Sequence, residues 1–119
     1  MSMNYDIELK IERKHLNAII SGEKVEDYRS IKPFYFQKFC VKRTEGEHKG
    51  KYFIATPEDY KPIKIIKFMA GYAKESPYAI VMIEKIRINT FVNFIPPQFK
   101  KGHTCFTIFI KKVLEIGNL

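Results

Sequence analysis

The alternation of apolar and polar residues defines the first element of the chain. In residues 5–13, isoleucine and leucine at every second position alternate with charged side chains. A period of two is typical of a strand with one buried face. Residues 13–22 then change to helical spacing and end at Gly22, a residue suited to the left-handed conformation that closes a helix. We therefore predict a strand followed directly by a helix.

Strands dominate the remaining pattern. A strand is predicted at residues 25–31, and Pro33 suits the first turn of a second helix, with Phe36, Phe39 and Cys40 as its buried stripe. A polar loop follows at residues 41–51. Runs rich in β-branched and aromatic residues predict four more strands, at residues 51–56, 63–72, 78–89 and 103–116. Residues 91–99 are expected to be irregular, because two consecutive prolines prevent regular ladder pairing.

This order predicts the fold class. About six strands and two early helices favour an α+β, mainly β, protein, with residues 1–119 forming a single domain. A small mixed β-barrel, closed or nearly closed, accommodates the helices against its side or end. A plain sandwich fits less well, because it leaves the early helices without a packing position.

The composition narrows the cellular setting. Hydrophobic residues make up 45% of the 119, enough for a packed core, and no apolar run approaches the roughly 20 residues that span a bilayer. The first residues lack the apolar region of a secretory signal, so we expect a cytoplasmic protein without a membrane partner. Cys40 and Cys105 are expected to be buried free thiols, and we predict no metal site and no cofactor.

The charge suggests polyanionic partners. The chain carries 21 lysines and arginines against 13 acidic residues, a formal net charge of +8. Such a surface attracts polyanions over long distances. Nucleic acid, a free nucleotide and an acidic protein all remain possible on this basis.

The segment SGEKVEDYRS, residues 21–30, concentrates charge where the helix gives way to a strand. Asp27 and Arg29 would share a strand face, roughly 6–7 Å apart and bracketed by Val25 and Ile31. A half-desolvated arginine offers a fork of donors suited to phosphate, carboxylate or a base edge. The alternative is an ordinary surface pair, which is worth under about 1 kcal/mol.

The run GEKVEDYR, preceded by HLNAIIS, is similar to the signature of the ASCH domain family, a branch of the PUA-like superfamily. The matching positions are Gly22, Lys24, Asp27 and Arg29, although the family more often carries glutamate at the third of these. Residues 66–88 also resemble the family's paired strands, in which an aromatic residue follows a glycine before a hairpin. The resemblance spans roughly residues 5–115.

The resemblance implies a PUA-type barrel with a basic cleft between the barrel and the first helix, where RNA or a nucleotide-like ligand binds. Lys24, Asp27 and Arg29 would line this cleft. Aromatic rings beside cations are what unstacked bases use, and nearby lysines and arginines would widen a basic rim. The further candidate ligand contacts are Tyr72, Tyr78, Lys10, Arg13 and Lys32.

Two other functions remain open. Some relatives are small amidohydrolases that deacetylate a modified cytidine such as N4-acetylcytidine, which would give Lys24 and Glu84 acid–base roles. These relatives have a threonine near the position of Asp27, so the same covalent route is not expected here. The third possibility is a protein-interaction subunit whose basic face meets an acidic partner.

Overall fold

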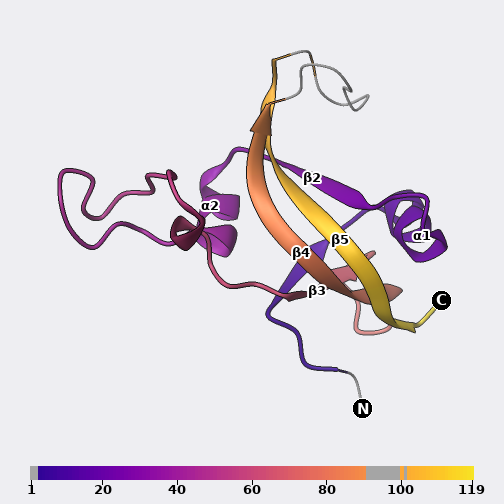
Figure 1. The fold of residues 1–119 in the computed structure, drawn as a ribbon. Helices are drawn as coiled ribbons and strands as arrows, with labels where there is room; N and C mark the ends of the chain where they lie inside the picture. The colour runs from indigo at the N-terminus through magenta and orange to yellow at the C-terminus, as the bar shows by residue number, and fades with distance from the viewer. Residues whose placement is uncertain (1–2, 91–99, 101) are drawn as a thin grey trace. The chain divides into compact units, whose positions relative to one another are not determined.

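A computed structural model of the chain describes residues 3–90, 100 and 102–119 (Figure 1). The chain forms two α-helices, one short 3-10 helix and five strands within this part. In chain order these are β1 (Ile7–Lys10), α1 (Arg13–Ser21), β2 (Glu26–Ser30), α2 (Pro33–Phe39), η1 (Pro57–Asp59), β3 (Ile65–Met69), β4 (Tyr78–Thr90) and β5 (Thr104–Gly117). None of the helices in the described part is long and apolar enough to cross a membrane.

The five strands form one sheet in the order β1-β3-β4-β5-β2, and β4 and β5 are its long neighbouring strands (Figure 1). β1 pairs with β3 in parallel, and β3 pairs with β4 in antiparallel orientation. The prediction of an α+β, mainly β, fold is confirmed, with five strands in place of about six. The irregular segment predicted at residues 91–99 lies outside the described residues.

The strand predicted at residues 51–56 is wrong. This segment forms no strand and leads into η1. The backbone N–H groups of Ala55 and Thr56 both donate to the Asp59 carboxylate, at 2.9 Å each. A strand would need such groups for its ladder, so the local side-chain acceptor competes with sheet pairing.

The end of α1 and the start of α2 are where the sequence predicts them. Gly22 follows α1 with φ of 85°, in the left-handed region that glycine adopts without a steric penalty, and its N–H donates to the Ile19 carbonyl. Pro33 opens α2, where its missing N–H costs no helical hydrogen bond.

The contacts divide the chain into two compact units. The first unit comprises residues 1–27, 63–85 and 108–119, and the second comprises residues 28–62 and 86–107.

The core of the first unit draws its buried side chains from α1 and from its strands. The register pairs Leu9 of β1 with Phe68 of β3, and Phe68 in turn with Ala79 of β4. These three side chains are buried, as are Leu16 and Ile19 of α1. Their burial explains both the period of two in β1 and the helical spacing in α1.

The core of the second unit is aromatic. Phe39 of α2 meets Phe106 of β5 edge to face, with ring centroids 5.2 Å apart, and Phe36 meets the same ring at 5.1 Å. Phe39 and Cys40 are fully buried and Phe36 is half-buried, so the predicted stripe is largely confirmed. Cys40 and Cys105 are both buried thiols outside any disulfide, as expected.

We predict that neither thiol reacts with a disulfide reagent in the native protein. Burial, reinforced by the nearby Asp59 carboxylate, raises the pKa of the Cys40 thiol to about 11. The thiolate is the nucleophile, and at pH 8 only about one Cys40 in a thousand would carry it. Labelling with a chromogenic disulfide at pH 8 should be slow in buffer and release two equivalents in denaturant. Fast native labelling would contradict the burial of these cysteines.

Candidate functional site

Lys24 and Asp27 lie together in the first unit. The Lys24 Nζ is 3.6 Å from Asp27 Oδ1, and the two side chains are only 15% and 6% exposed. The turn after α1 positions the lysine, because the Lys24 N–H donates to the carbonyl of Ala18 at 3.0 Å. Asp27 belongs to β2, which begins one residue earlier. The sequence signature therefore includes a largely desolvated ion pair.

His15 of α1 lies close to this pair. Burial, followed by the field of the Lys24 ammonium, lowers the pKa of the His15 imidazole. This residue was not predicted as part of the site. It stands beside buried Leu16 on the helix that leads into the signature, and that neighbourhood was the available clue.

Arg29 belongs to the second unit and contacts an aromatic residue. Its Nη1 donates to the Tyr35 hydroxyl at 3.2 Å, and its guanidinium carbon is 5.8 Å from the centre of the Tyr35 ring. Asp27 is buried and Arg29 is half-buried, as the sequence predicts, but Val25 and Ile31 are 59% and 38% exposed and do not form the apolar flanks expected around them. Both lie just outside β2, so strand alternation does not direct them inward.

Two further predicted residues, Lys10 and Tyr72, also come together in the first unit. The Lys10 Nζ is 5.1 Å from the centre of the Tyr72 ring, and Tyr72 is 89% exposed. The parallel register places Lys10 opposite Met69, three residues before Tyr72. The ammonium also donates to Glu8 Oε2 at 2.9 Å, which lowers the pKa of the Glu8 carboxyl. The result is a cation beside a ring that is open to solvent.

Tyr78, another predicted contact, is held in a second cation–aromatic group of the first unit. The Lys67 Nζ lies 4.5 Å from the centre of the Tyr78 ring and 5.4 Å from that of Tyr5. The Tyr78 hydroxyl donates to Glu115 Oε2 at 2.6 Å. The Tyr78 ring also packs directly on the backbone of Gly117, where an added Cβ would overlap it. Tyr78 is therefore fixed by its neighbours, whereas Tyr72 is open.

The other predicted residues lie at exposed positions. Arg13 stands at the start of α1, where its Nε donates to Asn17 Oδ1 at 3.2 Å. Lys32 immediately precedes α2, and Glu84, the acid of the amidohydrolase alternative, lies on β4. All three are solvent-exposed.

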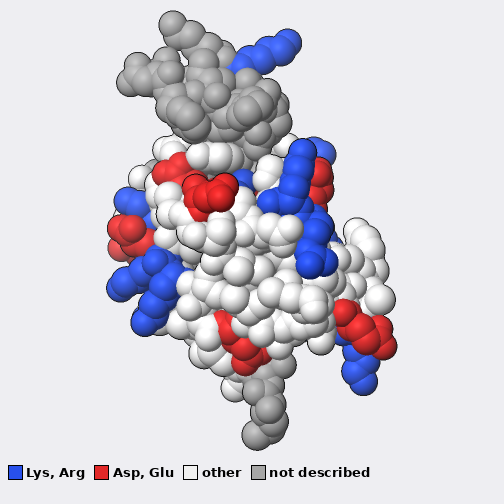
Figure 2. Space-filling view, turned by 90° about the vertical axis from the view of Figure 1, so that its right-hand side faces the viewer, with Lys and Arg blue, Asp and Glu red and all other residues white. Residues whose placement is uncertain are grey.

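Basic residues are interspersed with acidic ones on the face drawn in Figure 2. Acidic side chains lie next to several lysines or arginines there, and uncharged surface covers much of the remainder. The net charge of +8 is thus not gathered into one basic patch on that face. The candidate ligand contacts are therefore identified from individual cations paired with an acid or an aromatic ring. The net charge alone does not locate them.

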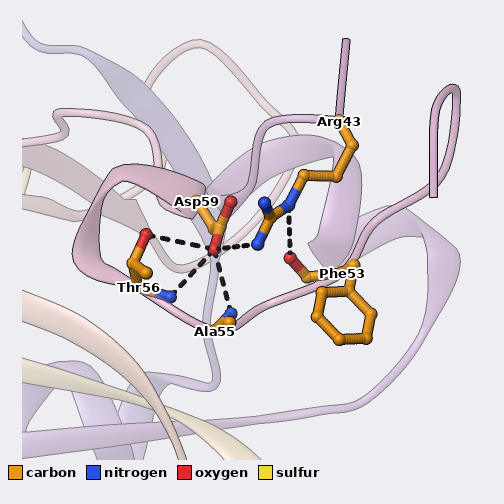
Figure 3. A network of polar contacts seen from close by, with 5 residues as sticks. All are labelled: Arg43, Phe53, Ala55, Thr56 and Asp59. Atoms are coloured by element: carbon orange, nitrogen blue, oxygen red, sulfur yellow. Dashed lines mark hydrogen bonds and ion pairs between the residues drawn. The ribbon is translucent and has the colours of Figure 1, made fainter. Parts of the chain in front are cut away.

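A carboxylate organises the loop before β3 in the second unit (Figure 3). Asp59 Oδ2 accepts the N–H groups of Ala55 and Thr56, and lies within 3.0 Å of Arg43 Nη2. The Arg43 Nε donates to the Phe53 carbonyl at 3.1 Å. These bonds, the backbone donors foremost, lower the pKa of the Asp59 carboxyl. One acid therefore fixes two segments of the loop.

The sequence does contain a signal for this loop. Thr56, Pro57 and Asp59 have the spacing of a helix start, with a cap residue, a proline in the first turn and an acid at the third helical position. No helix or strand is predicted from the sequence for residues 57–62, between the strands predicted at 51–56 and 63–72. Arg43 carried no comparable signal, since its partner lies 16 residues away.

Comparisons with protein-family models, with curated proteins and with solved structures gave no match to this chain. Within the described residues, no group of three or more histidine, cysteine or acidic side chains could hold a metal ion. The candidate site is therefore described from the contacts and burial of its own residues, without a related protein as a guide.

We predict that Lys24 and Asp27 are energetically coupled. Removing one member of a buried pair leaves the other charge uncompensated and costs about 3–5 kcal/mol when burial is complete. Asp27→Asn and Lys24→Met should each lower the free energy of unfolding by about 2–4 kcal/mol in urea titrations. The double variant should lose less than the sum of the two. Additive losses would show that the two groups are not coupled.

We also predict that Asp59 contributes to stability in a pH-dependent way. Because its folded pKa lies below its ordinary value near 3.8, its contribution is complete above that value and disappears as pH falls through the folded pKa. Asp59→Asn should lower the Tm at pH 7 and flatten the fall in Tm between about pH 5 and pH 2. Glu45→Gln, an exposed acid of the same unit, is the matched control. Equal acid profiles for Asp59→Asn and wild type would contradict the network.

Proposed function

We propose that the protein is a binding module for single-stranded RNA or a nucleotide-like ligand, with a PUA-like fold of the ASCH type. The observation that carries this proposal is the Lys10–Tyr72 pair, in which an ammonium lies 5.1 Å from the centre of a ring that is 89% exposed. A ring open to solvent can stack on an unpaired base, and the neighbouring cation can meet the phosphate.

The fold and the charge support this proposal. The chain folds mainly into a β-sheet and has a helix early in the sequence, as the ASCH resemblance implies. Its formal net charge of +8 favours a polyanionic ligand. Lys24 and Asp27 are near each other and largely buried, which suits a pre-organised site. Arg29, half-buried and beside Tyr35, offers a guanidinium for a phosphate or base edge. Cytoplasmic location remains part of the proposal.

The amidohydrolase alternative receives less support. Asp27 stands near the position where hydrolase relatives have a hydroxyl, and its carboxylate is paired with Lys24. Glu84, the proposed acid, is exposed on β4. Such chemistry requires an acid and a base held around one substrate. Lys24 is largely buried whereas Glu84 is exposed, so binding is the better-supported function. The third alternative, a protein-interaction subunit with a basic face, rests on the net charge of +8 alone, since the face in Figure 2 shows basic and acidic side chains interspersed.

We predict that Tyr72 and Lys10 are needed for ligand binding. Because stacking of one base is worth about 1–3 kcal/mol, Tyr72→Ala should weaken binding of a fluorescent single-stranded RNA by about fivefold or more. Tyr72→Phe should preserve most of the affinity. Lys10→Ala should weaken binding and reduce its dependence on salt. Fluorescence anisotropy at two salt concentrations measures all three.

Phe34→Ala is the matched control, because Phe34 is also exposed and lies under a lysine, Lys38, at 5.5 Å. Its affinity should equal that of the wild type. Arg29→Ala, added as a separate arm, tests whether the signature takes part, and we expect it to abolish binding. Unchanged affinity in both Tyr72→Ala and Arg29→Ala would reject the proposal.

A further inference from the structure

The second unit contains a pocket that the proposed function does not use. Its volume is about 330 Å³, and its lining combines the loop before β3 with the later part of β4. The residues that line it are Ile54, Ala55, Thr56, Pro57, Tyr60, Arg87 and Ile88. Pockets for small ligands range over about 300–1,000 Å³, so this one suits a small molecule better than a polymer.

The pocket has one charged group, the guanidinium of Arg87. This group lies over the Tyr60 ring, 4.7 Å from its centre, a cation–aromatic contact that arginine favours. Its Nη1 donates to the carbonyl of Ile86 at 2.6 Å, which fixes its direction. In the part of the chain that the structure describes, no carboxylate forms a salt bridge with Arg87. The salt bridges found there join acids to lysines and to another arginine. Arginine has five N–H donors, so several remain for a ligand.

The Tyr60 hydroxyl adds a second donor. It accepts the backbone N–H of Ile88 at 3.0 Å, and this bond holds the phenol against β4. The hydroxyl proton is then directed away from that bond and can be donated to a ligand. Ile54, Pro57 and Ile88 supply apolar surface around these two donors.

The loop wall of the pocket is pre-formed. The Asp59 carboxylate binds the N–H groups of Ala55 and Thr56, both of which line the pocket, and Tyr60 follows Asp59 directly. Because these two backbone donors are already used, they do not compete with Arg87 and Tyr60 for a bound anion. A wall held in place before the ligand arrives reduces the entropy cost of binding.

From this geometry we propose that the pocket binds a small organic oxoanion, whose phosphate or carboxylate group is held by Arg87 and the Tyr60 hydroxyl. The apolar or planar body of the ligand packs between Ile54, Pro57 and Ile88. A guanidinium can donate two parallel hydrogen bonds to two oxygens of a phosphate or carboxylate, and the opposite charges strengthen both bonds. This site lies in the second unit and does not depend on the RNA-binding proposal, which is centred on the first.

The test uses ligands that share one ring and differ in one group. Phenyl phosphate, benzoate and the uncharged benzamide are titrated into the full chain, together with inorganic phosphate, and binding is followed by calorimetry and by the NMR signals of Arg87 and Tyr60. One of the two ring-bearing oxoanions should bind at least about tenfold more tightly than benzamide, because a charge-assisted hydrogen bond is lost in the amide. It should also exceed inorganic phosphate, which lacks the apolar body. The order of phenyl phosphate and benzoate then identifies the oxoanion.

Arg87→Gln should weaken that binding by about tenfold or more. Arg87→Lys keeps the charge but loses the planar pair of donors, so its affinity should lie between those of the wild type and Arg87→Gln. Lys42→Gln is the matched control, because Lys42 also lies over a ring of the second unit, Tyr52, away from the pocket lining. Thermal unfolding of each variant confirms that it is folded. Equal affinity for benzoate, phenyl phosphate and benzamide, absence of binding by all of them, or unchanged affinity in folded Arg87→Gln would overturn the proposal.

Discussion

The parallel pairing of β1 with β3 is the constraint on which the first unit depends. The Asp6 carboxylate accepts the N–H groups of Lys64 and Ile65, at 2.8 and 2.9 Å, just before the two strands begin to pair. This fixes the register in which Leu9 lies opposite Phe68. Because side chains alternate along a strand, a slip by one residue would turn Leu9 outward and bring Lys10 into the core. The same register therefore buries the core and places Lys10 within reach of the Tyr72 ring.

The regular elements could be predicted because their signals are local. Gly22 and Pro33 mark one helix end and one helix start by backbone conformation alone, and the structure has both. The strand prediction at residues 51–56 failed because it too relied on local signals alone. Its β-branched and aromatic residues favour a strand, but Asp59, a few residues later, takes the N–H groups that pairing would require. Strand propensity is a property of each residue alone. Competition for the backbone N–H groups depends instead on a side chain elsewhere in the sequence, here that of Asp59.

The site was predicted less completely, because contacts between distant residues leave little trace in one sequence. Lys24 and Asp27 are three residues apart, and the resemblance to the ASCH signature singled out both, whereas the strand pattern alone placed Asp27 with Arg29. Lys10 and Tyr72 were each proposed, but their contact follows from the β1–β3 register and could not be predicted from spacing. Arg87 had no signal at all, since its importance arises from Tyr60, 27 residues earlier in the chain.

The two candidate recognition positions use the same chemistry in opposite settings. In the first unit, Tyr72 is almost fully exposed, so a stacked base would keep its neighbours in solvent and a chain could pass on either side. In the second unit, Tyr60 and Arg87 are half-buried in a pocket of about 330 Å³, whose walls limit the size of what enters. A cation beside an exposed ring selects weakly and admits a polymer, whereas the half-buried pair must replace part of the water that a bound anion loses. This partial burial makes the direction of each donor important, and Arg87 and Tyr60 both have that direction fixed by backbone contacts.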